Sequence, residues 1–408
     1  MRNVTRGTAV LATLAALSFG VSACGSSSKS DSGAGSSSGS SAAGSAAAST
    51  GGGGGSSSSS VTFGFMGALT GPNAQLGINI KNGAKLAIDQ YDASNPSVKI
   101  VLKDYDTTGD PAQASALAPK VVDDKVAAVI GPAFSGESKT ADPTLEEAKI
   151  PNISASATNA LLSKNGWKFW HRVLANDDVQ GPGVAKFIVG ALGAKKVAVI
   201  DDQSEYGKGL ADVVTKTIGS AATVKDSIDP KADDYSSTVN KIKGGSVDAI
   251  FYGGYYAEAA KFLKQLRDGG VTAKFVSGDG ALDQKLIDGA KSAAEGAFLS
   301  CTCVLATASD DPAVQKFIDD YTKAYGTSPA TYSAEGFDAA TALIKAVQAG
   351  KTSPGDINTF LGTVDFKGVS KPIKFAADGE LTSGSVYMHE VKDGKIIALG
   401  DYTTAKPQ

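Results

Sequence analysis

The sequence predicts an α/β protein of two lobes, each a doubly wound parallel sheet with helices on both faces. Short apolar runs, such as 98–102, 126–130 and 197–200, alternate with segments whose apolar residues recur at helical spacing. Strands separated in this way form βαβ units, which place neighbouring strands parallel. About 350 residues follow the low-complexity segment that ends at residue 60, which is too many for one compact core and suits two lobes.

The predicted elements follow one another in a regular order. In the first half, helices begin near Asn73, at Pro111 and after Gly136, between strands at 61–69, 98–102, 126–130 and 150–153. Further strands are expected at 197–200, 223–228, 248–252 and 275–278, separated by helices at 206–218, 235–243 and around Phe262. Helices at 312–325 and 333–349 precede strands at 373–375, 384–391 and 395–399. An Asp393-Gly394 turn predicts a hairpin between the last two strands.

The segment 126–158 carries the strongest indication of a binding site. Its first strand ends in a turn that contains Ser135 and Gly136, and its second ends in Ser154-Ala155-Ser156-Ala157-Thr158. A doubly wound sheet places its ligand at such strand ends. A helix N-terminus there offers free backbone N–H groups, which suit a carboxylate. The alternative is that both segments are ordinary βα turns, which favour Gly, Ser and Pro in any case.

A second group of residues follows strands in the other half of the chain. Tyr255 comes shortly after the strand at 248–252, and Asp279 follows the strand at 275–278. A carboxylate beside aromatic rings suits an ammonium group. One lobe therefore offers a seat for a carboxylate and the other a seat for an ammonium, the two groups of an α-amino acid. The alternative for Asp279 is a solvated turn residue.

The N-terminal segment predicts export and anchoring. Arg2 and Arg6 precede an apolar stretch at about 9–21 and a small-residue end, the pattern of a signal peptide over 1–23. The ending resembles the bacterial lipobox, which predicts lipidation at Cys24 and attachment to the outer face of the cytoplasmic membrane; a plain signal peptide is the alternative. Gly, Ser and Ala dominate the linker at 24–60, whose 36 residues after Cys24 give a flexible reach of roughly 30 Å.

Composition argues against several other classes. The formal net charge is −3 with mixed signs, so no basic stripe indicates nucleic-acid binding. His171 and His389 are the only histidines in the sequence, which argues against a histidine-based metal site or a histidine general base. We predict that the protein binds no metal and no cofactor. We also predict that it is a monomer. Two cysteines remain beyond Cys24. Cys301 and Cys303 form either a strained local disulfide or two free thiols, because residues i and i+2 on a strand lie near the limit of disulfide geometry.

Six short motifs occur in order across about half of the chain and together resemble one family. They are Gly67-Ala68-Leu69-Thr70-Gly71-Pro72, Asp104-Tyr105-Asp106 with Asp110-Pro111, Val129-Ile130-Gly131, Gln180-Gly181-Pro182, Tyr206-Gly207-Lys208-Gly209 and Tyr252-Gly253-Gly254-Tyr255. The sequence resembles the leucine/isoleucine/valine-binding family of solute-binding proteins that serve ABC importers. The resemblance implies a type I periplasmic binding fold with three crossovers, near Asp177, Cys303 and Thr382. Lobe 1 would then comprise 61–177 plus 304–382, and lobe 2 would comprise 178–303 plus 383–408.

The resemblance also implies roles for individual residues. Ser135 and Thr158 would hold the ligand carboxylate, while the Ser156 carbonyl and Asp279 would hold the ammonium. The remaining predicted ligand-binding residues are Ala157, in the same run as Ser156, together with Tyr206, Tyr255, Phe134 and Leu76. Leu76 departs from the aromatic residue of the best-known branched-chain binders, which leaves the side-chain pocket open.

The predicted function is capture of an amino acid, most simply a branched-chain one, and its delivery to an ABC permease. Other ligands, namely amides, aromatic acids or other amino acids, and a sensing role remain alternatives. An exported hydrolase with Ser135 as nucleophile is disfavoured, since the surrounding sequence is not G-x-S-x-G and no histidine lies at a predicted cleft-facing strand end. We therefore predict no catalytic residue.

Overall fold

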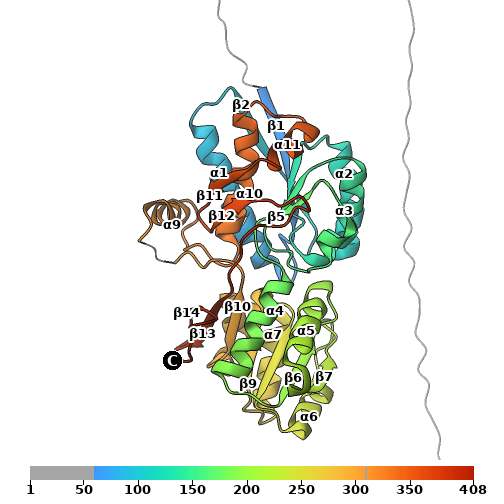
Figure 1. Ribbon diagram of the computed structural model, residues 1–408, viewed down its shortest axis with the longest axis vertical. Helices are drawn as coiled ribbons and strands as arrows, with labels where there is room; N and C mark the ends of the chain where they lie inside the picture. The colour runs from blue at the N-terminus through green and yellow to red at the C-terminus, as the bar shows by residue number, and fades with distance from the viewer. Residues whose placement is uncertain (1–58, 308–309) are drawn as a thin grey trace, which may run out of the picture. The chain divides into compact units, whose positions relative to one another are not determined.

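The computed structural model describes residues 59–307 and 310–408, which belong to one compact unit, Ser56–Gln408. Two sheets form the centres of two lobes within this unit (Figure 1). The predicted signal peptide, the lipidation site at Cys24 and nearly all of the predicted linker lie outside the described residues. Across the described part of the chain, no helix combines the length and apolarity that a membrane span requires.

Lobe 1 is built on a parallel sheet with the strand order β2-β1-β3-β4-β5. Its strands and first helices are β1 (Ser59–Gly67), α1 (Ala74–Ala93), β2 (Val98–Asp106), α2 (Pro111–Asp123), β3 (Ala128–Ile130), α3 (Ser135–Glu147), β4 (Asn152–Ser154) and β5 (Trp170–Arg172). Phe63 and Phe65 of β1 face the core on the α1 side, whereas Met66 packs with α2 and α3 on the other face. Helices therefore cover both faces, as predicted for a doubly wound sheet.

The chain returns to lobe 1 after passing through lobe 2. The returning elements are α9 (Pro312–Tyr325), α10 (Ser333–Gln348), α11 (Pro354–Leu361) and the small antiparallel pair β11 (Asp365–Lys367) and β12 (Pro372–Lys374). Helix α10 packs along α1, which joins the returning segment to the first core. The chain passes between the lobes three times: after β5, after β10 and after β12.

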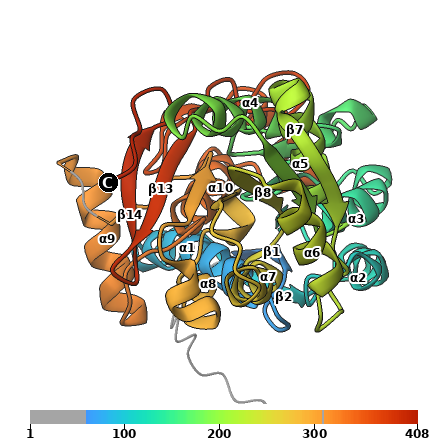
Figure 2. The same cartoon turned by 90° about the horizontal axis from the view of Figure 1, so that it is seen from below.

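Lobe 2 contains the sheet β14-β13-β10-β9-β8-β6-β7. In chain order its elements are α4 (Asp177–Lys186), β6 (Val197–Asp201), α5 (Glu205–Ile218), β7 (Ala222–Ser227), α6 (Ser236–Gly245), β8 (Ala249–Gly253), α7 (Tyr256–Asp268), β9 (Lys274–Ser277), α8 (Gln284–Ala290), β10 (Phe298–Cys301), β13 (Tyr387–Lys392) and β14 (Lys395–Asp401). Strands β6 to β10 are parallel, and the hairpin β13–β14 adds an antiparallel edge opposite β7 (Figure 2).

The predicted hairpin turn has the backbone that its sequence requires. Asp393 and Gly394 adopt φ values of 52° and 71°, a left-handed pair that Asp-Gly tolerates well. The sequence patterns do not predict β10, α8, α11 or β11. These elements run from three to eight residues, which is too short for a periodic pattern to stand out.

Candidate ligand-binding cleft

Both sheets place the predicted site residues at the carboxyl ends of their strands. Without its hairpin, the lobe 2 sheet runs β7-β6-β8-β9-β10, the same winding as β2-β1-β3-β4-β5 in lobe 1. The order reverses between β1 and β3 in one lobe and between β6 and β8 in the other, where loops diverge and leave a crevice. The two sets of strand ends face each other. The Gln75 backbone N–H donates to the Tyr256 hydroxyl across the gap at 3.1 Å, and Lys139 pairs with Glu205 at 2.8 Å.

On the lobe 1 side, the start of α3 is held in a fixed position. The Glu137 carboxylate accepts the backbone N–H of Phe134, the residue before the helix, at 2.9 Å and also the Thr107 hydroxyl, so it holds the turn before Ser135 in place. The Ser135 hydroxyl is buried and accepts the Asn159 backbone N–H at 3.2 Å. The residue predicted to bind a carboxylate therefore stands at the N-terminus of a helix.

The hydroxyl-rich run 154–158 lies directly against the turn before α3. Ser154 donates to the Pro132 carbonyl at 2.7 Å and accepts the Ala157 N–H at 3.0 Å, while Ser156 donates to the Ala133 carbonyl. These bonds bring together two of the predicted ligand-binding segments. The Thr158 hydroxyl is fully buried and lies beside the Asp177 carboxylate.

On the lobe 2 side, Asp279 is fully buried among neutral donors. One carboxylate oxygen accepts the Tyr206 hydroxyl at 2.6 Å and the Gln180 side-chain amide at 3.2 Å; the other accepts the Tyr332 hydroxyl at 2.7 Å. Burial raises the pKa of Asp279, and its hydroxyl and amide partners oppose that shift. None of these partners within the described part of the chain carries a positive charge.

Tyr332 and Gln180 are site residues that the sequence patterns miss. Tyr332 precedes α10 in lobe 1, so its bond to Asp279 crosses between the lobes. It adopts φ 69°, an unusual conformation for a tyrosine, which no local sequence pattern signals. Gln180 belongs to a motif that supports the family resemblance, and that motif is the one signal that could have indicated a role for it.

Aromatic rings form a continuous row across the cleft. The Tyr255 ring lies 4.6 Å from the Phe134 ring of lobe 1 and 5.2 Å from the Tyr206 ring, measured between centroids. Rings at such separations contribute to cohesion beyond the area that they bury. Phe134, Tyr255, Tyr206 and Asp279 are thus linked by direct contacts.

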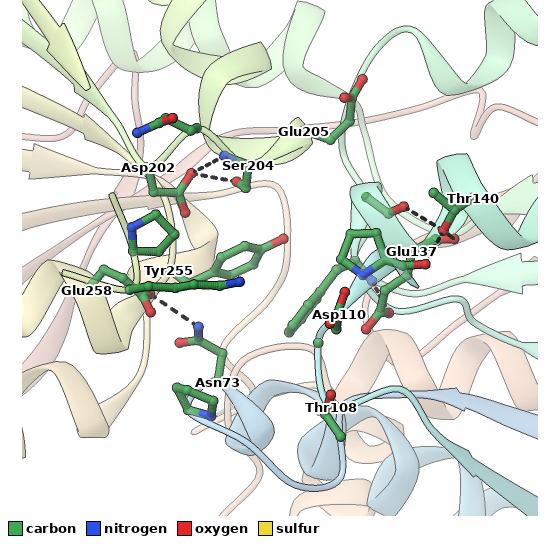
Figure 3. A pocket seen from close by; sticks show the side chains of 18 of the residues that line it. Asn73, Thr108, Asp110, Glu137, Thr140, Asp202, Ser204, Glu205, Tyr255 and Glu258 are labelled. Atoms are coloured by element: carbon green, nitrogen blue, oxygen red, sulfur yellow. Dashed lines mark hydrogen bonds between the residues drawn. The ribbon is translucent and has the colours of Figure 1, made fainter. Parts of the chain in front are cut away.

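A cavity of about 620 Å³ opens on one side of this row. Phe134 and Tyr255 line it, while Ser135, Ser156, Thr158, Tyr206 and Asp279 are buried and contribute no surface to it. Figure 3 shows acidic side chains from both lobes around the cavity, with Asn73 of lobe 1 reaching Glu258 of lobe 2 at 3.2 Å. Residues of both lobes line the cavity, so it belongs to the cleft, and of the predicted binding residues Phe134 and Tyr255 alone are in its lining.

Leu76 does not line the cavity but shares the main apolar core with Phe134. It is fully buried near the start of α1 and belongs to the main apolar core rather than to the cavity lining. A role for Leu76 in contacting the ligand side chain stays a prediction.

The two remaining cysteines lie at the second crossover. Cys301 and Cys303 are joined in a disulfide with a Cα–Cα distance of 5.0 Å, and both are fully buried. The intervening Thr302 donates to the Ala175 carbonyl at 3.0 Å, which connects the second crossover to the first. Of the two arrangements that the sequence leaves open, a local disulfide and two free thiols, the structure has the disulfide.

Neither histidine approaches Ser135 as a base would have to. His171 and His389 are buried in β5 and β13, and burial lowers the pKa of each to about 4. Neither contributes to the lining of the cavity. Over the described residues, no group of His, Cys, Asp or Glu is arranged to hold a metal ion.

Comparison with known proteins identifies the family. A sequence model described as "Periplasmic binding protein" matches residues 60–395. The chain is 30% identical over 351 residues to the Leu/Ile/Val-binding protein BraC3 of Rhizobium johnstonii, covering 83% of this chain and 93% of the relative. The chain belongs to the leucine/isoleucine/valine-binding family of periplasmic binding proteins. Members of this family are solute-binding proteins rather than enzymes, and they act outside the cytoplasm.

Solved structures of family members share the fold. The substrate-binding protein LivJ of Streptococcus pneumoniae, solved with isoleucine, has a TM-score of 0.78 and 29% identity over 83% of this chain and 98% of LivJ. The leucine-binding protein LivK of Thermotoga maritima has a TM-score of 0.77 and 28% identity over 85% of this chain and 99% of LivK. The predicted type I periplasmic binding fold and the family resemblance are both confirmed.

Proposed function

We propose that this protein captures a zwitterionic α-amino acid, in the first place leucine, isoleucine or valine, between its two closing lobes. One observation carries the proposal. The cleft has neutral donors on the lobe 1 face and, on the lobe 2 face, the buried carboxylate of Asp279, which has no cationic partner among the residues that the structure describes. A buried charge that lacks a counter-ion is unfavourable, so a ligand that brings the positive charge stabilises the closed form.

The carboxylate of the ligand binds at the start of α3. Helix α3 has 13 residues, and its first backbone N–H groups have no partner within the helix. Together with the Ser135 hydroxyl and the backbone N–H groups of the run ending at Thr158, they form a seat for a carboxylate. Glu137 leaves this seat open, because the Phe134 N–H and the Thr107 hydroxyl already occupy its oxygens.

The ammonium of the ligand binds at the opposite face. Asp279 accepts it in a charge-assisted hydrogen bond, and the Ser156 carbonyl accepts a second N–H. Tyr206 and Tyr255 add ring faces, which attract cations. The relatives support an aliphatic side chain, since one is called a Leu/Ile/Val-binding protein and LivJ was solved with isoleucine. Phe134, Ala157 and Leu76 then form the apolar surroundings of that side chain.

Capture serves transport in this proposal. Lipid on Cys24 anchors the protein to the outer face of the cytoplasmic membrane, and the linker lets the monomer reach an ABC permease, to which the lobes deliver the ligand. A Cys24→Ser variant would then leave the membrane fraction and reduce uptake of labelled leucine by the cells. Retention of the variant in the membrane fraction would contradict the anchoring.

A thermal-unfolding screen of Ser56–Gln408 tests the ligand class. After removal of any carried-over ligand, L-leucine, L-isoleucine or L-valine should raise the unfolding midpoint, because a ligand at 100 times its Kd stabilises the folded state by about 2.7 kcal/mol. Aliphatic amides and aromatic acids provide the comparison. A rise with those compounds alone, or with no amino acid, would overturn the proposed ligand class.

A further inference from the structure

A group of unpartnered polar atoms lies beside Asp279 and has no role in the site described so far. It consists of the Thr158 hydroxyl, both carboxylate oxygens of Asp177 and the side-chain carbonyl of Gln180. No described residue outside this group bonds to any of these atoms, and within it the Thr158 hydroxyl lies next to the Asp177 carboxylate. All three residues are at most 1% exposed. Such atoms are costly to bury without a partner, so their concentration at one place indicates a missing polar group.

Asp177 connects the two halves of the predicted site. Its backbone N–H donates to the Thr158 carbonyl at 2.9 Å, and it opens α4 at the first crossover. One turn later on the same helix, the Gln180 amide donates to Asp279 at 3.2 Å. The Asp177 carboxylate therefore lies between the run that ends at Thr158 and the Asp279 carboxylate.

The charges around Asp177 do not cancel. Burial raises its pKa well above the ordinary value, and the nearby Asp279 carboxylate raises it further. Among the described residues, Arg172 is the one cation that opposes these effects, and its guanidinium is already occupied. It forms an ion pair with Glu380 and donates to the carbonyls of Ala157 and Asn159 at 2.8 and 3.0 Å. The described interior thus places two carboxylates together with no cation of their own.

We propose that Asp177 is a second carboxylate of the ammonium site, which selects ligands that carry a positively charged amine. This inference rests on the proposed function. An ionised carboxylate only accepts hydrogen bonds, so the neighbouring Thr158 hydroxyl donates its proton to Asp177. The lone pairs of the Thr158 oxygen then point toward the ligand. Asp177 acts in this way as a positioning residue for Thr158 and as a negative charge for the amine, in addition to Asp279.

The test compares two ligands that differ only in the amine. The affinities of the full chain and of its Asp177→Asn variant are measured by calorimetry for L-leucine and for its 2-hydroxy analogue, 2-hydroxy-4-methylpentanoate. We expect the variant to bind leucine at least about tenfold more weakly, as for loss of a charge-assisted contact, and to keep its affinity for the hydroxy acid. The ratio of the two affinities should fall accordingly.

Asp142→Asn provides the matched control. Asp142 is also 1% exposed, has one unpartnered oxygen among the described residues and has a pKa raised by burial, but it belongs to α3 and its other oxygen accepts the Asn152 side-chain amide. The Asp142→Asn variant should leave the ratio of the leucine affinity to the hydroxy-acid affinity unchanged. If Asp177→Asn does not fold, Thr158→Val, which removes the hydroxyl alone, should lower the same ratio.

The outcomes separate this inference from the function on which it rests. An unchanged ratio in Asp177→Asn, or in Thr158→Val where that variant is needed, would overturn the role of Asp177 while amino-acid capture stands. An equal fall in the Asp142→Asn control would show a general effect of buried charge and would also overturn it. Failure of the unaltered chain to bind any amino acid would instead overturn the proposed function.

Discussion

The two faces of the cleft share one topology and have opposite chemistry. Each face is the carboxyl edge of a parallel sheet at the point where the strand order reverses. In lobe 1 the strand β3 leads into a turn and a helix that begins with Ser135. In lobe 2 the strands β8 and β9 lead into Tyr255 and Asp279. The few residues after each strand therefore decide whether the same scaffold binds an anion or a cation.

The difference also lies in how each face treats its own acids. Glu137 of lobe 1 is used internally, since it accepts a hydroxyl and a backbone N–H that hold the turn in place. Within the described residues, Asp279 of lobe 2 receives only neutral donors, and Asp177 has only the neutral Thr158 hydroxyl beside it as a donor. In lobe 1 the carboxylate of Glu137 therefore stabilises the turn, while in lobe 2 the negative charge of Asp279 stays available to a ligand. A zwitterion can then bind in one orientation only.

Removal of the lobe 2 charge should have the largest effect on binding. Asp279→Asn keeps the shape and part of the hydrogen bonding to Tyr206 and Tyr332 but loses the charge. We expect leucine binding to weaken by ~2–5 kcal/mol, the range for removing one member of a buried charge pair. Calorimetry gives the affinity, and thermal unfolding without ligand checks the fold. Full leucine affinity in a folded variant would contradict the assignment of the ammonium site to lobe 2.

Removal of the lobe 1 hydroxyl should have a smaller effect. Ser135→Ala deletes one neutral donor to the ligand carboxylate and leaves the backbone N–H groups of α3 in place. We expect a loss of about 1.5 kcal/mol in leucine affinity, typical of a hydrogen bond to a charged group. An anion that lacks an amine, such as 4-methylpentanoate, should lose the same amount. A loss confined to leucine would place Ser135 at the wrong end of the ligand.

The comparison of the faces also explains which parts could be predicted from the sequence. Ser135, Tyr255 and Asp279 follow strands directly, so a local reading of strand and turn is sufficient to find them. Tyr332 lies 53 residues from Asp279 and comes from the other lobe, and only the tertiary fold brings it to the carboxylate. Asp177 marks a predicted crossover, yet its burial and its missing partners are properties of packing. Contacts between residues of different lobes produce no periodic pattern in the sequence, so they cannot be predicted from it.

Weakening the direct contact between the faces should have a still smaller effect on binding. Tyr332→Phe removes the hydroxyl that bonds Asp279 across the lobes and keeps the ring. We expect the closed form to lose about 1 kcal/mol, which lowers ligand affinity several-fold through the smaller closed population. Small-angle X-ray scattering of the ligand-free protein should give a larger radius of gyration than for the unaltered chain. An unchanged radius together with unchanged affinity would show that this bond does not hold the lobes together.

Replacement of the internally used acid should affect binding least and stability most clearly. Burial raises the pKa of Glu137 to about 7, although its hydroxyl and N–H partners oppose the shift. The unfolded value is about 4.3. The folded state therefore binds more protons between these values, and the free energy of unfolding falls as the pH rises through this window. One such group contributes a slope of at most about 1.4 kcal/mol per pH unit.

Glu137→Gln cannot titrate, so its stability should fall less steeply from pH 5 to pH 7 than that of the unaltered chain, as measured by urea unfolding. Asp202 in lobe 2 is the matched control, because burial also raises its pKa to about 7, and Asp202→Asn should reduce the slope in the same direction. Leucine affinity should stay within about twofold in Glu137→Gln, since the acid serves the turn rather than the ligand. A large loss of affinity with an unchanged slope would reverse the contrast between the faces and make Glu137 a ligand-binding charge of lobe 1.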